Sequence, residues 1–244
     1  MDHLKEEIIK ALKVQREIFG DELFNGEENY IVKRINEEMP VVKRKTEVVS
    51  NSFQSAGSLE ELNGIICNCM KCILGSTRKN FVFGTGNPHA DVLILGEGPG
   101  ADEDEQGLPF VGRAGKLLTD ILKAIKFERE EVYIANVVKC RPPGNRTPYP
   151  EEMDCCMPYL KKQIELINPK LILCVGLTAA QGLLKKKEAL GKMRGQVFEF
   201  EGRKVMITYH PAALLRNPNW KRGCWEDVQA FRKLYNGLIN HSAE

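Results

Sequence analysis

Runs of consecutive apolar residues mark four segments of the chain as buried β-strands. Three of them, DVLILGEG (91–98), EVYIANVVK (131–139) and KLILCVGL (170–177), are apolar for most of their length. The fourth, VFEFEGRKVMITYHP (197–211), is predicted to form a hairpin whose second arm is another core strand. Near-continuous apolar strands are typical of a mostly parallel sheet that is covered on both faces.

Helical periodicity fills the segments between these strands. The spacing of apolar residues predicts helices over 112–125, 150–167, 178–185 and 229–238. Strands that alternate with helices predict an α/β fold, a three-layer sandwich with a central four-stranded, mostly parallel sheet. Ligands bind at the carboxyl ends of such strands, and this edge collects three segments: GEGPG (96–100), Asn136 and YHPAALL (209–215).

The first 60 residues follow a different pattern. Leu4, Ile8, Leu12 and Phe19 recur at helical spacing, so residues 2–19 are predicted to form an amphipathic helix. Residues 20–57 are polar without a clear period and are interpreted as a linker. The chain is therefore expected to divide into an N-terminal helical extension with its linker, residues 1–60, and a main domain, residues 61–244.

Composition and charge narrow the class of protein. The chain has 244 residues and a net charge of +2, but 9 basic and 12 acidic side chains precede residue 61, while 26 basic and 21 acidic ones follow. A modestly basic main domain permits nucleic-acid binding. The sequence has no run of 18 apolar residues, and its first residues are charged, so neither a membrane span nor a signal peptide is expected. We therefore expect a cytoplasmic protein.

The eight cysteines are expected to be reduced in the cytoplasm, so their spacing matters more than their even number. Cys69 and Cys72 form a C-x2-C pair, and Cys140 and Cys156 flank a proline-rich loop. Four thiolates in two pairs suit either tetrahedral zinc or a [4Fe–4S] cluster, and the spacing alone leaves both open. The alternative is that Cys140, Cys155 and Cys156 are buried thiols that act as small hydrophobic residues.

Two other segments carry polar chemistry at the expected functional edge. GEGPG follows a strand, and G-x-G is a weak sign of dinucleotide binding, although Pro99 interrupts the turn and no Walker-type lysine follows. The acidic run ADEDE (101–105) is interpreted as a solvated loop. His210 ends the fourth predicted strand, where a structural histidine is the simpler interpretation of this residue taken alone.

Three motifs in a fixed order resemble one family. GEGPGADEDEQGLPFVGRAG (96–115), NVVKCRPPGNRTPYPEE (136–152) and YHPAALLRNP (209–218) closely resemble the family 4 uracil-DNA glycosylases, the iron–sulfur branch of their superfamily. The resemblance covers about residues 64–240 and includes the C-x2-C and C-x15-C spacings. It implies a four-stranded parallel sheet between helices, and it has no counterpart for residues 1–60.

The resemblance implies an activity and the residues for it. Such an enzyme flips uracil out of DNA and hydrolyses its N-glycosidic bond, which leaves an abasic site for base excision repair. Phe110 matches the aromatic residue that stacks on the base, Asn136 the amide that pairs with uracil, and His210 the donor to uracil O2. The cofactor is then a [4Fe–4S] cluster rather than zinc, with four ligands: Cys69, Cys72, Cys140 and Cys156.

Further roles follow from the same resemblance. Family 1 members have an aspartate in G-Q-D-P-Y. The matching position in this chain, in the base pocket, is Gly98. Glu97 is therefore the favoured acidic catalytic group, and Glu103 is the second candidate. Asn145 is expected to orient the substrate. The apolar wedge that fills the gap left by the flipped base is assigned to Leu214 or its neighbour Leu215. Phosphate contacts are assigned to three arginines: Arg141, Arg146 and Arg216.

The expected partner is uracil-containing DNA, double- or single-stranded. The N-terminal extension is a candidate contact for a replication or repair partner, and the protein is expected to be a monomer without a membrane partner. Two other classes stay open: a non-catalytic, metal-containing DNA-binding module and a nucleotide-cofactor enzyme. Release of free uracil from DNA distinguishes the glycosylase from both.

Overall fold

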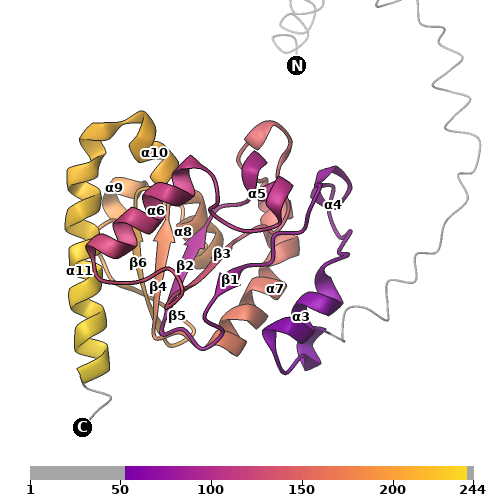
Figure 1. The fold of residues 1–244 in the computed structure, drawn as a ribbon, viewed down its shortest axis with the longest axis horizontal. Coiled ribbons are helices and arrows are strands. Elements are labelled where there is room, and N and C mark those ends of the chain that lie inside the picture. Colours follow the sequence, from indigo (N-terminus) through magenta and orange to yellow (C-terminus); the bar gives the residue numbers. More distant parts are fainter. Residues whose placement is uncertain (1–52, 241–244) are drawn as a thin grey trace, which may run out of the picture. The chain divides into compact units, whose positions relative to one another are not determined.

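The computed structural model describes residues 53–240. In this part of the chain, six strands form one sheet in the order β1-β3-β2-β4-β6-β5 (Figure 1). The central strands run parallel to one another: β3 (Tyr133–Asn136), β2 (Val92–Gly96), β4 (Leu171–Val175) and β6 (Arg203–Thr208). The two edge strands pair antiparallel with their neighbours: β1 (Thr85–Gly86) and β5 (Phe198–Phe200). The predicted four-stranded parallel centre and the hairpin over 197–211 are confirmed, and β1 is an addition.

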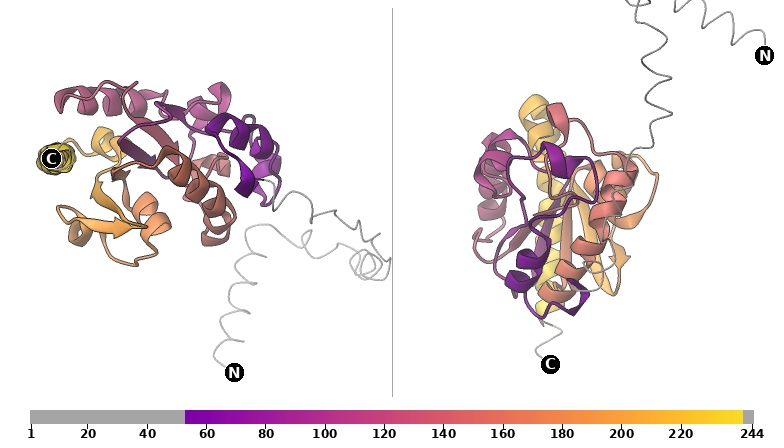
Figure 2. Two further views of the ribbon diagram at one scale, coloured as in Figure 1. Left: turned by 90° about the horizontal axis from the view of Figure 1, so that it is seen from below. Right: turned by 90° about the vertical axis from the view of Figure 1, so that its right-hand side faces the viewer.

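Helices cover both faces of the sheet, as Figures 1 and 2 show. One face packs against three helices: α3 (Leu59–Ile66), α7 (Pro150–Ile167) and α8 (Leu177–Leu184). The other face packs against three more: α6 (Arg113–Ala124), α10 (Pro211–Arg216) and α11 (Lys221–Asn240). Alternate side chains of a strand point to opposite faces, so in β2 Leu93 and Leu95 join the first core, and Val92 and Ile94 the second. The predicted three-layer sandwich is confirmed.

Short helices complete the described part of the chain: η2 (Phe53–Ser55), α4 (Leu74–Thr77), α5 (Ala101–Gln106), η3 (Pro143–Asn145), α9 (Leu190–Met193) and η4 (Pro218–Trp220). The interpretation of ADEDE as a solvated loop is wrong, because it forms α5. Asp104 in this helix is 2% exposed, and its carboxylate accepts the backbone N–H groups of Lys79 and Asn80 at 2.9 and 3.3 Å. The acidic run therefore anchors a neighbouring segment.

The main domain begins earlier than the predicted linker allows. Phe53 and Ala56 are 5% and 2% exposed, and the Phe53 ring packs edge-on against Tyr159 with centroids 5.0 Å apart. Phe53 and Ala56, which lie within the predicted linker, thus pack in the core of the main domain. The helix predicted over residues 2–19 lies outside the described residues, and a boundary at residue 60 stays a prediction. Between residues 53 and 240, no helix has the length and apolar character needed to cross a membrane.

Register places the ends of the parallel strands side by side. Gly96 at the end of β2 lies opposite Asn136 at the end of β3, and Val175 of β4 lies opposite Thr208 of β6. His210 follows β6 by two residues and is the N-cap of α10. The carboxyl edge of the sheet therefore gathers the segments that the sequence predicted to be functional.

Candidate active site

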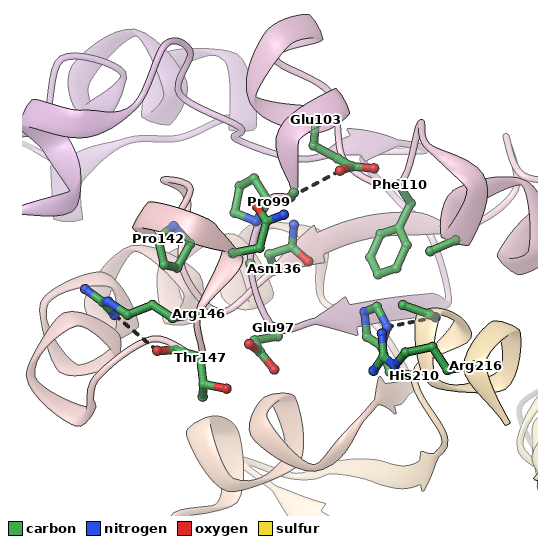
Figure 3. Close-up of a pocket in the computed structure, with 15 residues that line it drawn as sticks. Glu97, Pro99, Glu103, Phe110, Asn136, Pro142, Arg146, Thr147, His210 and Arg216 are labelled. Atoms are coloured by element: carbon green, nitrogen blue, oxygen red, sulfur yellow. Dashed lines mark hydrogen bonds between the residues drawn. The ribbon is translucent and has the colours of Figure 1, made fainter.

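A pocket of about 420 Å³ opens at the carboxyl edge of the parallel strands (Figure 3). Residues from the end of β2, the segment around α5 and α6, the end of β3, the η3 loop and α10 line it. It includes nine residues that were predicted to be functional: Glu97, Gly98, Glu103, Phe110, Asn136, Asn145, Arg146, His210 and Arg216. The structure thus brings together side chains more than 100 residues apart in sequence, and their roles stay predictions until tested.

Phe110 is held in a backbone conformation that non-glycine residues rarely adopt, with φ of 54°. The Glu103 carboxylate accepts the backbone N–H groups of the next two residues at 2.9 and 3.0 Å. The Arg129 guanidinium donates to the Phe110 carbonyl at 3.1 Å. Gly115 in α6 lets the Phe110 carbonyl pack closely against the helix, because a Cβ at residue 115 would lie 1.9 Å from the carbonyl oxygen. The ring is therefore fixed at the pocket wall before any ligand binds.

The Glu103 carboxylate is already occupied by backbone donors. Its carboxylate also accepts the backbone N–H of Gly100 at 3.1 Å, so three backbone donors occupy it. A carboxylate engaged in this way is poorly placed to activate water. We therefore correct its assignment as a catalytic acid or base: Glu103 is a positioning residue for the Phe110 loop.

Asn136 places an amide in the wall of the pocket. The side chain is 2% exposed, and its Oδ1 is buried without a hydrogen-bond partner among the described residues. Gly96 makes room for it, because a Cβ at Gly96 would lie 2.3 Å from this Oδ1 and 2.6 Å from the Phe110 ring. An unpaired buried polar atom costs about 1–3 kcal/mol. A ligand that donates a hydrogen bond to Asn136 would remove that cost.

His210 presents a neutral imidazole. Its Nδ1 accepts the backbone N–H of Ala212 at 3.1 Å, which assigns the ring proton to Nε2. Burial lowers the pKa of His210 to about 4, and the charge of Arg216 acts in the same direction. The imidazole lies 5.7 Å from the Phe110 ring with 30° between the ring planes. The geometry therefore supplies an uncharged N–H donor next to an aromatic face.

Glu97 supplies the acidic group of the pocket. Burial raises the pKa of this carboxyl above its usual range, and a hydrogen bond with the Thr178 hydroxyl opposes that shift in part. Thr178 lies at the start of α8, so this hydrogen bond connects the Glu97 carboxylate to that helix. Thr178 and Arg129 were not predicted from the sequence, because hydrogen bonds between distant elements leave no spacing pattern.

The loop between Cys140 and α7 uses its charged side chains internally. Arg146 forms two hydrogen bonds with the Glu152 carboxylate at 2.8 and 2.6 Å and lies 3.9 Å above the Tyr149 ring. The Arg141 Nε donates to the Asn145 Oδ1 at 2.7 Å. The assignment of Arg146 as a phosphate contact is therefore corrected, because its charge is already neutralised by a carboxylate that is 5% exposed. Asn145 lines the pocket, whereas Arg141 does not line it and contacts it only through Asn145.

The segment after His210 was predicted to contact DNA, and the structure corrects one of its assignments. Leu214 is 1% exposed and belongs to the core beneath α6, so it is wrong as the wedge. Leu215 is 39% exposed on the same short helix. Arg216 follows it, is exposed, lines the pocket and forms no salt bridge within residues 53–240. Leu215 and Arg216 are thus the side chains of α10 that are free to meet DNA.

The four predicted cysteine ligands interact with one another electrostatically. Cys140 and Cys156 are each 4% exposed. Burial raises the pKa of Cys140, and the nearby Cys72 and Cys69 raise it further. Burial raises the pKa of Cys156 to about 12, with Cys140 and Cys72 adding to the shift. Four sulfurs from the α3–α4 segment, the end of β3 and α7 therefore share one region.

Each of these sulfurs accepts a hydrogen bond. Arg78 donates to the Cys140 sulfur at 3.1 Å, and the Tyr159 hydroxyl donates to the Cys69 sulfur at 3.4 Å. Backbone N–H groups serve the Cys72 and Cys156 sulfurs. Donors of this kind stabilise thiolate ligands. Across residues 53–240, no three His, Cys, Asp or Glu side chains lie close enough to hold a single metal ion.

The chain belongs to the uracil DNA glycosylase superfamily, whose model matches residues 83–234. It is 44% identical to the type-4 uracil-DNA glycosylase of Archaeoglobus fulgidus over 185 residues, 72% of this chain and 93% of that protein. It is 48% identical to the type-4 uracil-DNA glycosylase of Thermotoga maritima over 178 residues, 70% of this chain and 93% of that protein.

Proposed function

We propose that this protein is a uracil-DNA glycosylase that flips uracil out of DNA and hydrolyses its N-glycosidic bond. The observation that carries the proposal is the convergence of Phe110, Asn136 and His210 on one pocket of about 420 Å³. The similarity to type-4 uracil-DNA glycosylases supports it along most of the chain. A stacked base is out of reach of such a pocket, so the nucleotide must leave the duplex first.

Recognition of the base follows from the pocket wall. An extruded pyrimidine stacks on the Phe110 ring, while the Asn136 amide lies at its edge. Uracil offers an N3–H donor to the unpaired Oδ1 and an O4 acceptor to the amide NH₂. Cytosine offers an acceptor and an amino group at these positions, so both hydrogen bonds fail. One amide thus selects uracil over cytosine.

Bond cleavage needs stabilisation of charge on both sides of the glycosidic bond. The departing uracil carries negative charge on O2, toward which the neutral Nε2–H of His210 donates a hydrogen bond. A preorganised donor of this kind contributes about 10²- to 10³-fold in rate. The ionised Glu97 carboxylate stabilises the sugar cation and orients the attacking water. The fixed backbone around Phe110 keeps these groups in place during the reaction.

A uracil-release assay tests the function. The full chain is incubated with a duplex that contains one uracil opposite guanine, and abasic sites are measured by alkaline strand cleavage. We expect cleavage at the uracil and none in a duplex with cytosine at the same position. A protein that binds the uracil duplex without releasing base would instead support the non-catalytic DNA-binding module.

We further propose that Cys69, Cys72, Cys140 and Cys156 hold a [4Fe–4S] cluster. In such a cluster each cysteine binds a different iron atom, so the four sulfurs need not surround a single ion. Two buried and two half-buried sulfurs that interact with one another and all accept hydrogen bonds suit this arrangement. When bound, the cluster joins the α3–α4 segment to the η3 loop at the pocket rim. Cytoplasmic location, a monomeric state and a partner for the N-terminal extension, residues 1–60, stay predictions from the sequence.

Acid pH is expected to inactivate the enzyme through Glu97. The reactive form is the carboxylate, and burial raises its pKa, so activity falls at a higher pH than for an exposed glutamate. His210 stays neutral until the pH approaches about 4 and does not cause this loss. The measurement is kcat/KM against pH for the full chain and for Glu97→Gln. An unchanged acid limb in Glu97→Gln would rule out this assignment.

Leu215→Ala is expected to slow uracil release from duplex DNA by roughly tenfold, since about 1–2 kcal/mol of apolar contact with the opened stack is lost. Single-stranded substrate should be affected much less, because it has no paired stack to hold open. Val197→Ala, which truncates another exposed apolar side chain (51% exposed), is the matched control. Equal losses on both substrates would argue against a wedge.

A further inference from the structure

Lys139 is a fully buried lysine that the proposed reaction does not use. It follows β3 and is 0% exposed. Its ammonium donates to the Asn136 backbone carbonyl at 2.8 Å, and Lys139 forms no salt bridge within the described residues. Lysine is almost never fully buried without a paired charge. The surroundings of Lys139 must therefore explain why this side chain is buried.

Lys139 lies between the cysteine centre and the base pocket. Its backbone N–H donates to the Cys156 sulfur, and Cys140 follows it in the chain. Both cysteines interact electrostatically with its ammonium. The Lys139 ammonium donates to the backbone carbonyl of Asn136, whose side-chain amide is proposed to recognise the base. Lys139 thus links the two sites: its backbone donates to a proposed cluster ligand, and its side chain donates to the residue proposed to select uracil.

Charge compensation accounts for the buried position of Lys139. Four cysteine thiolates give an iron–sulfur centre a net negative charge, which a buried ammonium can offset without water. The same ammonium donates to the carbonyl of Asn136 at the end of β3, a carbonyl that faces the core beside the pocket wall. A small rotation there would move the Asn136 amide away from the ring of Phe110.

We propose that Lys139 is a positioning residue that couples the cysteine centre to uracil recognition. Its ammonium is held by the negative charge of the four thiolates and fixes the backbone of Asn136, and with it the amide that pairs with the base. The inference rests on the proposed function, because it concerns the orientation of the group that selects uracil.

The test replaces Lys139 by methionine, which keeps most of its volume and removes the charge. Lys162→Met is the matched control, because Lys162 is 9% exposed and pairs with Glu165 on α7, away from the pocket. We expect Lys139→Met to slow single-turnover uracil release and to weaken inhibition by free uracil, each by about 10- to 100-fold. We also expect faster loss of iron to a chelator. Lys162→Met should alter none of these three properties.

A double-mutant cycle separates positioning from general damage. If Lys139 acts through Asn136, then Lys139→Met added to Asn136→Ala lowers excision by no more than about twofold further. The faster loss of iron should persist in that background. Full additivity in excision, or iron retention equal to that of the unmodified chain, overturns the inference. Should Lys139→Met fail to fold, Lys139→Gln, which keeps an N–H donor, is put through the same cycle.

An assay of the unmodified chain in parallel distinguishes failure of the proposed function from failure of the proposed role of Lys139. If it releases no uracil, the proposed function is overturned. If it is active and Lys139→Met is equally active, the function stands and the role of Lys139 is overturned.

Discussion

Asn136→Leu is expected to lower the rate of uracil release by roughly 30- to 10⁴-fold. The substitution keeps the shape of the side chain but removes the acceptor and the donor that face uracil N3–H and O4. Each buried partner left unpaired costs about 1–3 kcal/mol, and about 1.4 kcal/mol corresponds to a tenfold change in rate. The native Oδ1 has no protein partner among the described residues, so the folded protein gives up little stability when it is removed.

Single-turnover release from a duplex with uracil opposite guanine measures this effect. Asn63→Leu is the matched control, because the Oδ1 of Asn63 is also buried without a partner but lies beside β1, outside the pocket. We expect Asn63→Leu to excise uracil at the rate of the unmodified chain. Thermal unfolding of both variants checks that neither loses its fold. A rate for Asn136→Leu within about threefold of the control would contradict the assigned hydrogen bonds.

Much of this fold is predictable from the sequence because its signals are local. Apolar runs such as LILCV (171–175) identify buried parallel strands, and chain order places their carboxyl ends at one edge. That edge predicts Asn136 and His210 as neighbours before any coordinates are known. The two-residue edge strand β1 was missed, because Thr85 and Gly86 carry no periodic pattern.

The errors at the site arise from contacts that are not local. Leu214 and Leu215 are adjacent and chemically identical, and only the direction in which α10 packs decides which one is buried. Consecutive helical side chains point about 100° apart, so one leucine enters the core and the other faces solvent. Glu103 and Arg146 were likewise assigned from residue type, whereas their partners on the backbone and on Glu152 decide what they do.

The site also depends on residues that carry no catalytic chemistry. Gly96 and Gly115 are required because a Cβ at either position would collide with Asn136, Phe110 or both. Arg129 ties the Phe110 carbonyl to the segment before β3. The reactive geometry is thus a consequence of close backbone approaches, which explains why side chains alone did not reveal it.

Cys140→Ala is expected to remove the proposed iron–sulfur centre and most of the activity. The thiol is 4% exposed and sits where β3 leads into the loop that lines the pocket, so losing one iron ligand frees that loop from α7. Loss of a structural metal site costs on the order of 4–5 kcal/mol. For a chain of this size that lowers the melting temperature by roughly 10–20 °C. Iron content, absorbance near ~400 nm and thermal unfolding measure the three consequences.

Cys174→Ala separates loss of the cluster from loss of a buried thiol. Cys174 is 0% exposed in β4 and interacts with none of the four proposed ligands, since burial is the sole cause of its raised pKa. Its truncation should cost about 1–2 kcal/mol through the small cavity it leaves, with iron and activity retained. If Cys140→Ala keeps its iron and has the same melting temperature as Cys174→Ala, then Cys140 is an ordinary core thiol. The η3 loop would then be held by the Arg146–Glu152 pair alone, and the proposed coupling through Lys139 would lose its source of negative charge.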